Sequence, residues 1–315
     1  MKVYLGVDTS NYTTSLAAYC EDGRMISEKK LLPVEQGAKG LRQSDALFLH
    51  VKQLPEVSEA LFSRLPADFT VVGVGASSRP RDVEGSYMPC FLAGRTLAHT
   101  LAKSSKVPLR EFSHQAGHIA AALFGADRLD LLSSEFISFH VSGGTTEGLY
   151  IRPSKISFET SIVSKTLDIS AGQLIDRVGV SMGLAFPAGS ELEKIALRYE
   201  GKVAAKPVLK GNDCCLSGVE NICARLLSEN ASQEYVAAYC FDYVAQMLVR
   251  ISERLKAQFG DIPFLYAGGV MSSSIIKEYV SARIPGSVFT KPEYSSDNAA
   301  GIAYLTAAVN ALSQR

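Results

Sequence analysis

VYLGVDTSNYTTSLAAY, residues 3–19, sets the pattern from which the fold of this chain can be predicted. It reads as a buried strand, a turn rich in hydroxyl side chains at residues 8–15, and a returning strand. The same arrangement recurs at residues 136–151, where an apolar strand passes through SGGTT at 142–146 into a second strand. One such hairpin early in each half predicts an α/β chain built from two related lobes with a cleft between them.

Hydrophobic periodicity predicts alternating strands and helices along the rest of the chain. Short apolar runs predict further strands at 71–76, 109–112, 263–267 and 287–290. Helices are expected at 41–65, 89–103, 114–124, 169–182, 190–199, 219–227, 232–259 and 273–282, with a last small-residue helix ending at Leu312. Residues 203–215 read as loop or weak strand. On helix 41–65, the polar side chains of Asp45, His50 and Lys52 are expected to face solvent.

Composition bounds the class of protein. The 315 residues include 32 Lys and Arg and 32 Asp and Glu, so net charge gives no sign of a nucleic-acid or anionic-membrane partner. A balanced net charge does not exclude a local basic face. No apolar run approaches the roughly 20 residues that cross a bilayer. The six cysteines form no C-x-x-C pair, which favours reduced thiols. A soluble cytoplasmic protein without a membrane partner is therefore expected.

Two of the five histidines lie one helical turn apart, at the start of the predicted helix 114–124. His114 and His118 are at i and i+4, so both rings leave the same face of the helix. This spacing allows two imidazoles to hold one metal ion. Ser113 precedes them and is expected to cap the helix. The alternative is a solvated His114 and a half-buried His118 without a metal, because two ligands do not make a site.

Polar or glycine-rich segments follow several predicted strands, where α/β proteins tend to place function. The polar loop at 77–86 is too long for a plain connector. The SGGTT turn at 142–146 can cradle a phosphate with backbone N–H groups. Gly268 and Gly269, after strand 263–267, allow a nucleotide to approach a helix start, although a close helix–strand crossing explains the pair equally well.

Taken in order, these motifs resemble the TsaD/Gcp family of the ASKHA (actin-like ATPase) superfamily. The resemblance rests on Gly6–Ser10, His114–His118, Val141–Thr145, Ala171–Asp176, Phe186–Gly189, Leu216–Gly218, Ala267–Val270 and Ser296–Ala300. It spans nearly the whole chain and implies an α/β, two-lobed, ribonuclease H-like fold with a duplicated mixed sheet and a central nucleotide cleft. The implied lobes are residues 1–112 with 295–315, and residues 113–294, with the nucleotide and metal site at their interface.

The resemblance also implies the composition of the site. His114, His118 and Asp297 match three ligands of one divalent metal ion, Fe or Zn. Without the resemblance, Asp297 reads as the N-cap of the last helix. Asp176 matches an acid that binds the ribose of an adenine nucleotide or acyl-adenylate, such as ATP, AMP or threonylcarbamoyl-AMP. The full set of implied nucleotide-binding residues is His140, Val141, Ser142, Gly143, Gly144, Asp176, Gly189, Gly268, Gly269 and Ser273.

The chain departs from the family pattern at specific positions. The family writes Glu-Thr-Ser-Cys-Asp-Glu-Thr in the first hairpin, whereas this chain has Tyr12 and Thr13 in place of the last two acids. Thr145 stands where the family has a histidine, Ser273 stands where it has an asparagine, and the family's Gly-Pro-Gly loop has become polar and basic at 79–85. Hydroxyl groups do not titrate near neutral pH. No catalytic residue is therefore assigned.

The resemblance implies a transferase that moves a threonylcarbamoyl group from threonylcarbamoyl-AMP to N6 of adenosine-37 in tRNA. It would act with a smaller paralogous subunit and an ATPase, or as a homodimer. The altered residues Thr13, Thr145 and 79–85 favour an alternative, a divergent paralogue with another acceptor. A non-catalytic partner subunit is a third hypothesis, against which the retained metal ligands argue. A sugar kinase of the same fold would have no use for the histidine pair.

Overall fold

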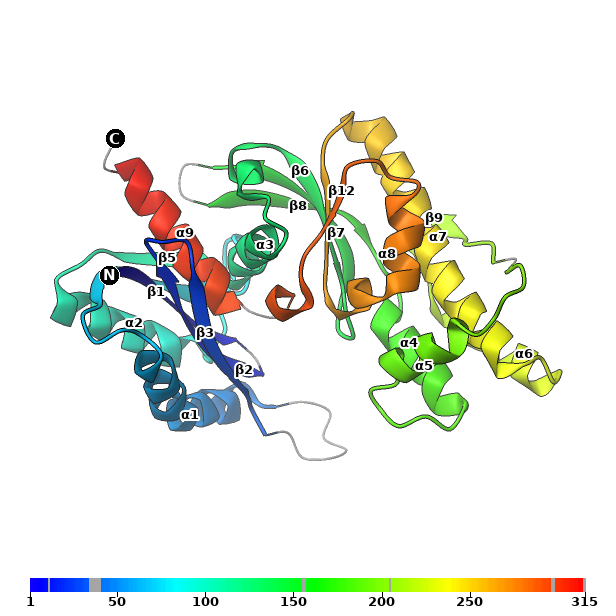
Figure 1. The fold of residues 1–315 in the computed structure, drawn as a ribbon, viewed down its shortest axis with the longest axis horizontal. Helices are drawn as coiled ribbons and strands as arrows, with labels where there is room; N and C mark the ends of the chain where they lie inside the picture. The colour runs from blue at the N-terminus through cyan, green and yellow to red at the C-terminus, as the bar shows by residue number, and fades with distance from the viewer. Residues whose placement is uncertain (11, 34–40, 155–156, 204, 296–297, 314–315) are drawn as a thin grey trace. The chain divides into compact units, whose positions relative to one another are not determined.

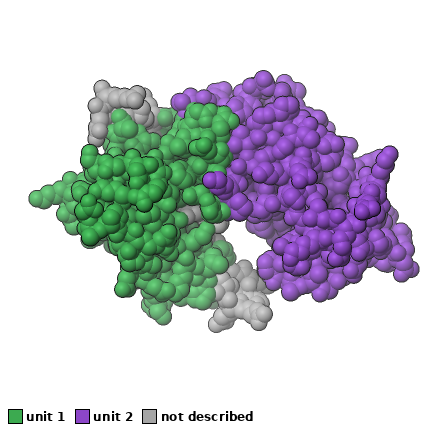
Figure 2. Space-filling model, in the orientation of Figure 1, with its two compact units in different colours: residues 1–132, 153–159, 293–315 green, residues 133–152, 160–292 purple. Residues whose placement is uncertain are grey.

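The computed structural model of the chain describes residues 1–10, 12–33, 41–154, 157–203, 205–295 and 298–313 (Figure 1). The chain divides into two compact units, coloured separately in Figure 2. Unit 1 comprises residues 1–132, 153–159 and 293–315, and unit 2 comprises residues 133–152 and 160–292. Each unit is built on a five-stranded sheet covered by helices, which confirms the predicted α/β class.

The sheet of unit 1 has the strand order β3-β2-β1-β4-β5. Strands β1, β2 and β3 form an antiparallel meander, and β4 and β5 continue the sheet parallel to β1. The strands are β1 Lys2–Ser10, β2 Thr13–Cys20, β3 Met25–Leu31, β4 Thr70–Arg79 and β5 Leu109–Ser113. The tight hairpin between β1 and β2, with Ser10 opposite Thr13, is the one predicted from residues 3–19.

Helices cover the sheet of unit 1: α1 Gln43–Ser63, α2 Phe91–Ser105, α3 His114–Gly125 and α9 Asn298–Ser313. The alternation of β1 directs Val3, Leu5 and Val7 into one core with α1 and α2. Gly6 points the other way, where an added Cβ would meet the Ala299 carbonyl. The missing side chain therefore allows α9, red in Figure 1, to lie close to the strands.

The sheet of unit 2 repeats the plan of unit 1, with the order β12-β11-β6-β7-β8. Strand β7 is antiparallel to β6, and β11 and β12 follow parallel on the other side of β6. The strands are β6 Phe136–Val141, β7 Thr146–Pro153, β8 Phe158–Lys165, β11 Phe264–Ala267 and β12 Ser287–Phe289. An antiparallel hairpin followed by two parallel strands in both units confirms the duplicated mixed sheet.

The core of unit 2 gathers around α7, most of whose apolar side chains are buried. Its helices are α4 Ala171–Ser181, α5 Gly189–Ala196, α6 Ser217–Ser228, α7 Gln233–Phe259 and α8 Ser274–Ser281. The region predicted as loop or weak strand holds the short pair β9 Leu209–Lys210 and β10 Asp213–Cys214. Short 3₁₀ segments lie at Leu129–Ser133, Gly269–Ser272 and Pro292–Tyr294. None of the described helices is both long and apolar enough to cross a bilayer.

Two expectations from the sequence, the set of strands and the exposure of His50, need correction. Strands β3 and β8 were not predicted, because β3 is largely polar and both strands expose much of their length. The helix that carries the histidine pair belongs to unit 1. The physical reason is close packing of α3 on α9, where an added Cβ at Gly301 would meet the Gly117 carbonyl. His50, expected in solvent, is fully buried, whereas Asp45 and Lys52 are exposed as predicted.

Candidate functional site

The histidine pair lies on the first two turns of α3. The predicted cap is confirmed, because the Ser113 hydroxyl accepts a hydrogen bond from the Ala116 amide at 3.1 Å. The rings of His114 and His118 lie together, with centroids 4.5 Å apart and planes inclined by 72°. Both side chains are half-buried. The pair therefore presents two imidazoles at one place on unit 1, as its spacing predicted.

Asp8, at the end of β1, is the acid that contacts this pair. Its side chain is fully buried, and its Oδ2 lies 2.8 Å from Nδ1 of His114. Its Oδ1 accepts a hydrogen bond from the Ser10 amide at 2.9 Å. Burial alone raises the pKa of Asp8, but the charge that His114 carries when protonated and its hydrogen bond, with smaller contributions from the Ser77 and Ser10 side chains, outweigh burial and lower it. The sequence offered no sign of this contact, which joins residues far apart in the chain.

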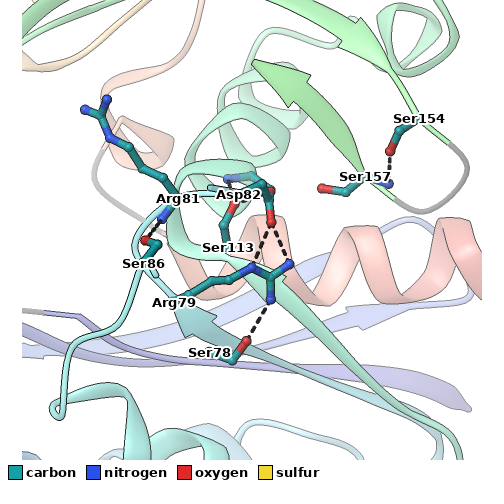
Figure 3. A network of polar contacts seen from close by, with 9 residues as sticks. Ser78, Arg79, Arg81, Asp82, Ser86, Ser113, Ser154 and Ser157 are labelled. Atoms are coloured by element: carbon teal, nitrogen blue, oxygen red, sulfur yellow. Dashed lines mark hydrogen bonds and ion pairs between the residues drawn. The ribbon is translucent and has the colours of Figure 1, made fainter. Parts of the chain in front are cut away.

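A polar network holds the start of α3 from the side of the altered loop. Arg79 donates to Asp82 Oδ1 from Nε at 2.9 Å and from Nη2 at 2.5 Å. The Ser113 hydroxyl donates to Asp82 Oδ2 at 2.6 Å, so the residue that caps α3 is itself tied to the loop (Figure 3). The Gln115 amide also donates to the Pro80 carbonyl at 3.0 Å. The loop that departs from the family pattern is thus structurally coupled to the histidine helix.

Two of the three predicted metal ligands, His114 and His118, lie together in the structure. Within the described ranges, no three His, Cys, Asp or Glu side chains come together in a metal-binding arrangement. The predicted third ligand, Asp297, lies outside the described residues, and α9 begins directly after it at Asn298. Two adjacent imidazoles, one of them hydrogen-bonded to a carboxylate, match the pattern in which a second group orients a ligating histidine. The ligand role of all three residues stays a prediction.

The SGGTT turn of unit 2 is tightly folded. Its Ser142 hydroxyl accepts from the amides of Gly144 and Thr145 at 3.3 and 3.1 Å. The turn rests on the start of α4, because the Ser170 hydroxyl donates to the Gly143 carbonyl at 2.7 Å. An added Cβ at Gly172 would lie 2.6 Å from the Gly143 backbone. The glycines therefore allow a backbone turn to sit directly on a helix N-terminus, an arrangement suited to binding anions.

A pocket of about 560 Å³ opens beside this turn in unit 2. The predicted nucleotide-binding residues that line it are Gly143, Asp176, Gly189, Gly269 and Ser273. The others, His140, Val141, Ser142, Gly144 and Gly268, do not line this pocket. Gly268 instead makes room for the neighbouring strand, because an added Cβ would meet the backbone of Val141. The structure thus brings half of the predicted set together around one cavity.

Two acids in this pocket have structural partners. Asp176 Oδ1 accepts from the Ala188 amide at 2.8 Å and so fixes the turn that follows α4. Glu193, which the sequence analysis did not single out, accepts from the hydroxyls of Ser273 and Ser274, each at 2.9 Å. Its position one helical turn after Gly189 on α5 was the available signal. Phe186, the first residue of the Phe186–Gly189 motif, also lines the pocket and is 75% exposed.

Three of the residues that replace family polar groups, all in the two hairpins, are accessible. Tyr12 is 39% exposed, and Thr13 and Thr145 are half-buried. The next residue, Thr14, is fully buried and contacts His50 and Gln53 instead. The hydroxyls of Thr13 and Thr145 can form hydrogen bonds to a ligand but cannot act as bases near neutral pH. This part of each hairpin offers polarity without titratable groups.

Comparison with known proteins places the chain among tRNA-modifying enzymes. A family model described as TsaD, tRNA N6-adenosine threonylcarbamoyltransferase, matches residues 44–304. A tRNA N6-adenosine threonylcarbamoyltransferase of Methanopyrus kandleri is 26% identical over 307 residues, 96% of this chain and 86% of that protein. A “Probable bifunctional tRNA threonylcarbamoyladenosine biosynthesis protein” of Methanothermobacter thermautotrophicus is 27% identical over 312 residues, 96% of this chain and 54% of that protein.

Solved structures share the fold at low identity. HypF in its phosphate- and nucleotide-bound form aligns with a TM-score of 0.59 and 12% identity, over 98% of this chain and 46% of HypF. The (R)-2-hydroxyglutaryl-CoA dehydratase component A of Acidaminococcus fermentans aligns with a TM-score of 0.57 and 14% identity, over 98% of this chain and 100% of that chain. At these identities the likeness establishes the ASKHA type of fold and carries nothing about activity.

Proposed function

The chain belongs to the TsaD family of transferases, and from this premise we propose that it transfers a threonylcarbamoyl group from threonylcarbamoyl-AMP to N6 of adenosine-37 in tRNA. The observation that carries the proposal is the pocket of unit 2, which five of the predicted nucleotide-binding residues line. Its volume of about 560 Å³ is in the range of small-molecule and cofactor sites.

The proposed transfer consists of an attack by the amine, the departure of AMP and the loss of one proton. The N6 amine attacks the carbamoyl carbon, a C–N bond forms, the bond from that carbon to the bridging phosphate oxygen breaks, and AMP leaves with the electron pair. The amine gives up one proton, which passes to solvent water. The pocket of unit 2 would bind the AMP part, with Asp176 at the ribose, the backbone of Gly143 near the phosphate and Gly269 beside the adenine. Thr145 can orient a polar group there by hydrogen bonding but cannot take the proton.

We propose that His114 and His118, with Asp297, hold one divalent metal ion, Fe or Zn. Such an ion supplies Lewis acidity that polarises a carbonyl group. Two features support the assignment: the imidazole rings are 4.5 Å apart between centroids, and a buried carboxylate, Asp8, contacts one of them. That the metal and nucleotide sites face a common cleft stays a prediction.

Metal content of the purified protein tests this site directly. His118→Ala is expected to lower Zn²⁺ or Fe²⁺ occupancy, measured by mass spectrometry of metals after loading and desalting. His99→Ala is the matched control, because His99 is exposed on α2, outside the pair. Equal occupancy in wild type, His118→Ala and Asp297→Ala would refute the metal site. Reduced occupancy in His99→Ala as well would point to adventitious binding.

A second candidate keeps the adenylate and changes the acceptor. It is favoured by the network in which Asp82 joins Arg79 to Ser113, since this network stands where the family has Gly-Pro-Gly. Complementation of cells that lack the tRNA-modifying enzyme separates the two candidates. Rescue by wild type, but not by His118→Ala, is the expected result. Absence of rescue at good expression, with AMP still bound to the protein, would select another acceptor and sink the first proposal.

We also propose a cytoplasmic protein that works with a smaller paralogous subunit and an ATPase, or as a homodimer. Helix α1 offers a surface for such a partner, because Phe48 and Val51 are 62% and 53% exposed on it. Leu54, Val57 and Leu61 of the same helix already face the core. Apolar side chains exposed on one helix favour contact with another protein.

A further inference from the structure

Asp8 is a buried carboxylate whose two oxygens each have a protein partner. The Ser10 amide lies 2.9 Å from Oδ1, and Nδ1 of His114 lies 2.8 Å from Oδ2. A backbone amide can only donate, so Oδ1 is an acceptor. A carboxylate is an acceptor at both oxygens, which makes Nδ1 of His114 the donor. A neutral imidazole has one N–H, so the other nitrogen, Nε2, carries the lone pair.

We propose that Asp8 is the positioning residue that keeps the proton of His114 on Nδ1 and so makes Nε2 the atom that binds metal. The inference rests on the histidine-pair metal site of the proposed function and adds the ligating atom and the group that selects it. Metal-binding histidines generally donate their second N–H to a carboxylate or carbonyl, which fixes the ring. Asp8 acts in this way through His114 and is not itself a ligand.

The frame around Asp8 is rigid enough for this role. The next residue, Thr9, donates from its hydroxyl to the Cys90 carbonyl and accepts from the Gly94 amide, each at 3.0 Å. The end of β1 is thereby pinned to the start of α2. On the other side, the cap formed by Ser113 holds the first turn of α3. Neither partner can turn away without breaking several buried contacts, so the distance between Asp8 and His114 is fixed by the fold.

The substitution Asp8→Asn provides a sharp test. The Ser10 amide would still require an acceptor, so the amide oxygen of Asn would face Ser10 and its NH₂ would face His114. Nδ1 would then become an acceptor and the ring proton would move to Nε2. We expect long-range ¹H–¹⁵N spectra of the metal-free protein to show Nδ1–H at His114 in wild type and Nε2–H in Asp8→Asn. We expect Zn²⁺ affinity, from competition with a chromophoric chelator, to fall about 10–100-fold in Asp8→Asn.

The conservative variant Asp8→Glu keeps two acceptor oxygens and is expected to retain Nδ1–H and most of the Zn²⁺ affinity. A neutral wild-type His114 ring that carries its one proton on Nε2 would overturn the inference, whether or not Asp8→Asn folds. So would Asp8→Asn binding Zn²⁺ as tightly as wild type with a native amide spectrum. A wild type with Nδ1–H that binds neither Zn²⁺ nor Fe²⁺ would uphold the proton assignment and refute the metal site of the proposed function.

Discussion

Burial of His50 predicts that the protein loses stability in mild acid. The ring is fully buried between α1 and the first hairpin, and Nδ1 lies 2.8 Å from the Thr14 hydroxyl. Gln53 donates from Nε2 to the Leu31 carbonyl, which turns its Oε1 toward Thr14. Thr14 therefore donates to Gln53 and accepts from Nδ1–H of His50. The remaining nitrogen, Nε2, is buried without a hydrogen bond, so a second proton there would be costly.

The magnitude follows from the pKa. Burial lowers the pKa of His50 from 6.5 to about 4, although the Asp8 carboxylate and the Ser10 backbone act in the opposite direction. The unfolded chain binds this proton below about pH 6.5 and the folded chain only below about pH 4. Between those values the unfolded state binds more protons, so stability falls as the pH falls. The loss from pH 7 to pH 5 is about 2 kcal/mol.

Urea unfolding at pH 7 and pH 5 measures this loss. His50→Gln removes the titrating ring, so the wild type is expected to lose about 2 kcal/mol more than the variant over the same interval. His99→Gln, at an exposed position of α2, is the matched control and is expected to follow the wild type. Equal pH dependence in wild type and His50→Gln, or a His50 ring that titrates near pH 6.5 by NMR, would refute the reasoning.

Two further substitutions test the packing of α3 and the pocket. Gly301→Ala places a Cβ against the Gly117 carbonyl and should lower the free energy of unfolding by about 1–3 kcal/mol, measured in urea. Gly218→Ala is the control, because an added Cβ there meets no atom within 4 Å, and it should leave the free energy of unfolding unchanged or slightly raise it. Equal changes in the free energy of unfolding for Gly301→Ala and Gly218→Ala would show that α3 and α9 are not in close contact. Asp176→Ala removes the acceptor of the Ala188 amide and should weaken AMP binding at least tenfold by calorimetry, whereas unchanged affinity would exclude Asp176 from the nucleotide site.

Most of the fold could be predicted from sequence because its elements follow strong periodic patterns. The exceptions have physical reasons. On α1 the buried stripe is 46, 50, 53, 54, 57 and 61, a helical period that includes two polar residues, His50 and Gln53. Polarity suggested solvent for His50, while its spacing from Ala46 and Leu54 placed it inside. The helical period of the buried residues therefore predicts the burial of His50 better than the polarity of its side chain does.

The candidate site was predictable only in its local parts. The helical histidine pair and its Ser113 cap depend on residues within one turn, and the structure confirms that arrangement. The Asp8–His114 contact and the role of Glu193 depend on tertiary packing between distant segments, for which a single sequence carries no periodic signal. The place of α3 in unit 1 also depends on tertiary packing, since an added Cβ at Gly301 of α9 would meet the Gly117 carbonyl of α3.

The residues around the two hairpins differ in burial. Asp8, an acid where the family has Glu, is buried, and Ser142, which matches the family pattern, is tightly bonded. Among the departures from the family pattern, Tyr12, Thr13 and Thr145 are accessible, whereas Ser273 is buried and bonded to Glu193. In the proposed function, buried frame residues would hold the nucleotide and the metal, whereas accessible side chains would meet an acceptor that approaches from solution. We therefore expect acceptor assays to discriminate between the candidate functions where nucleotide binding alone does not.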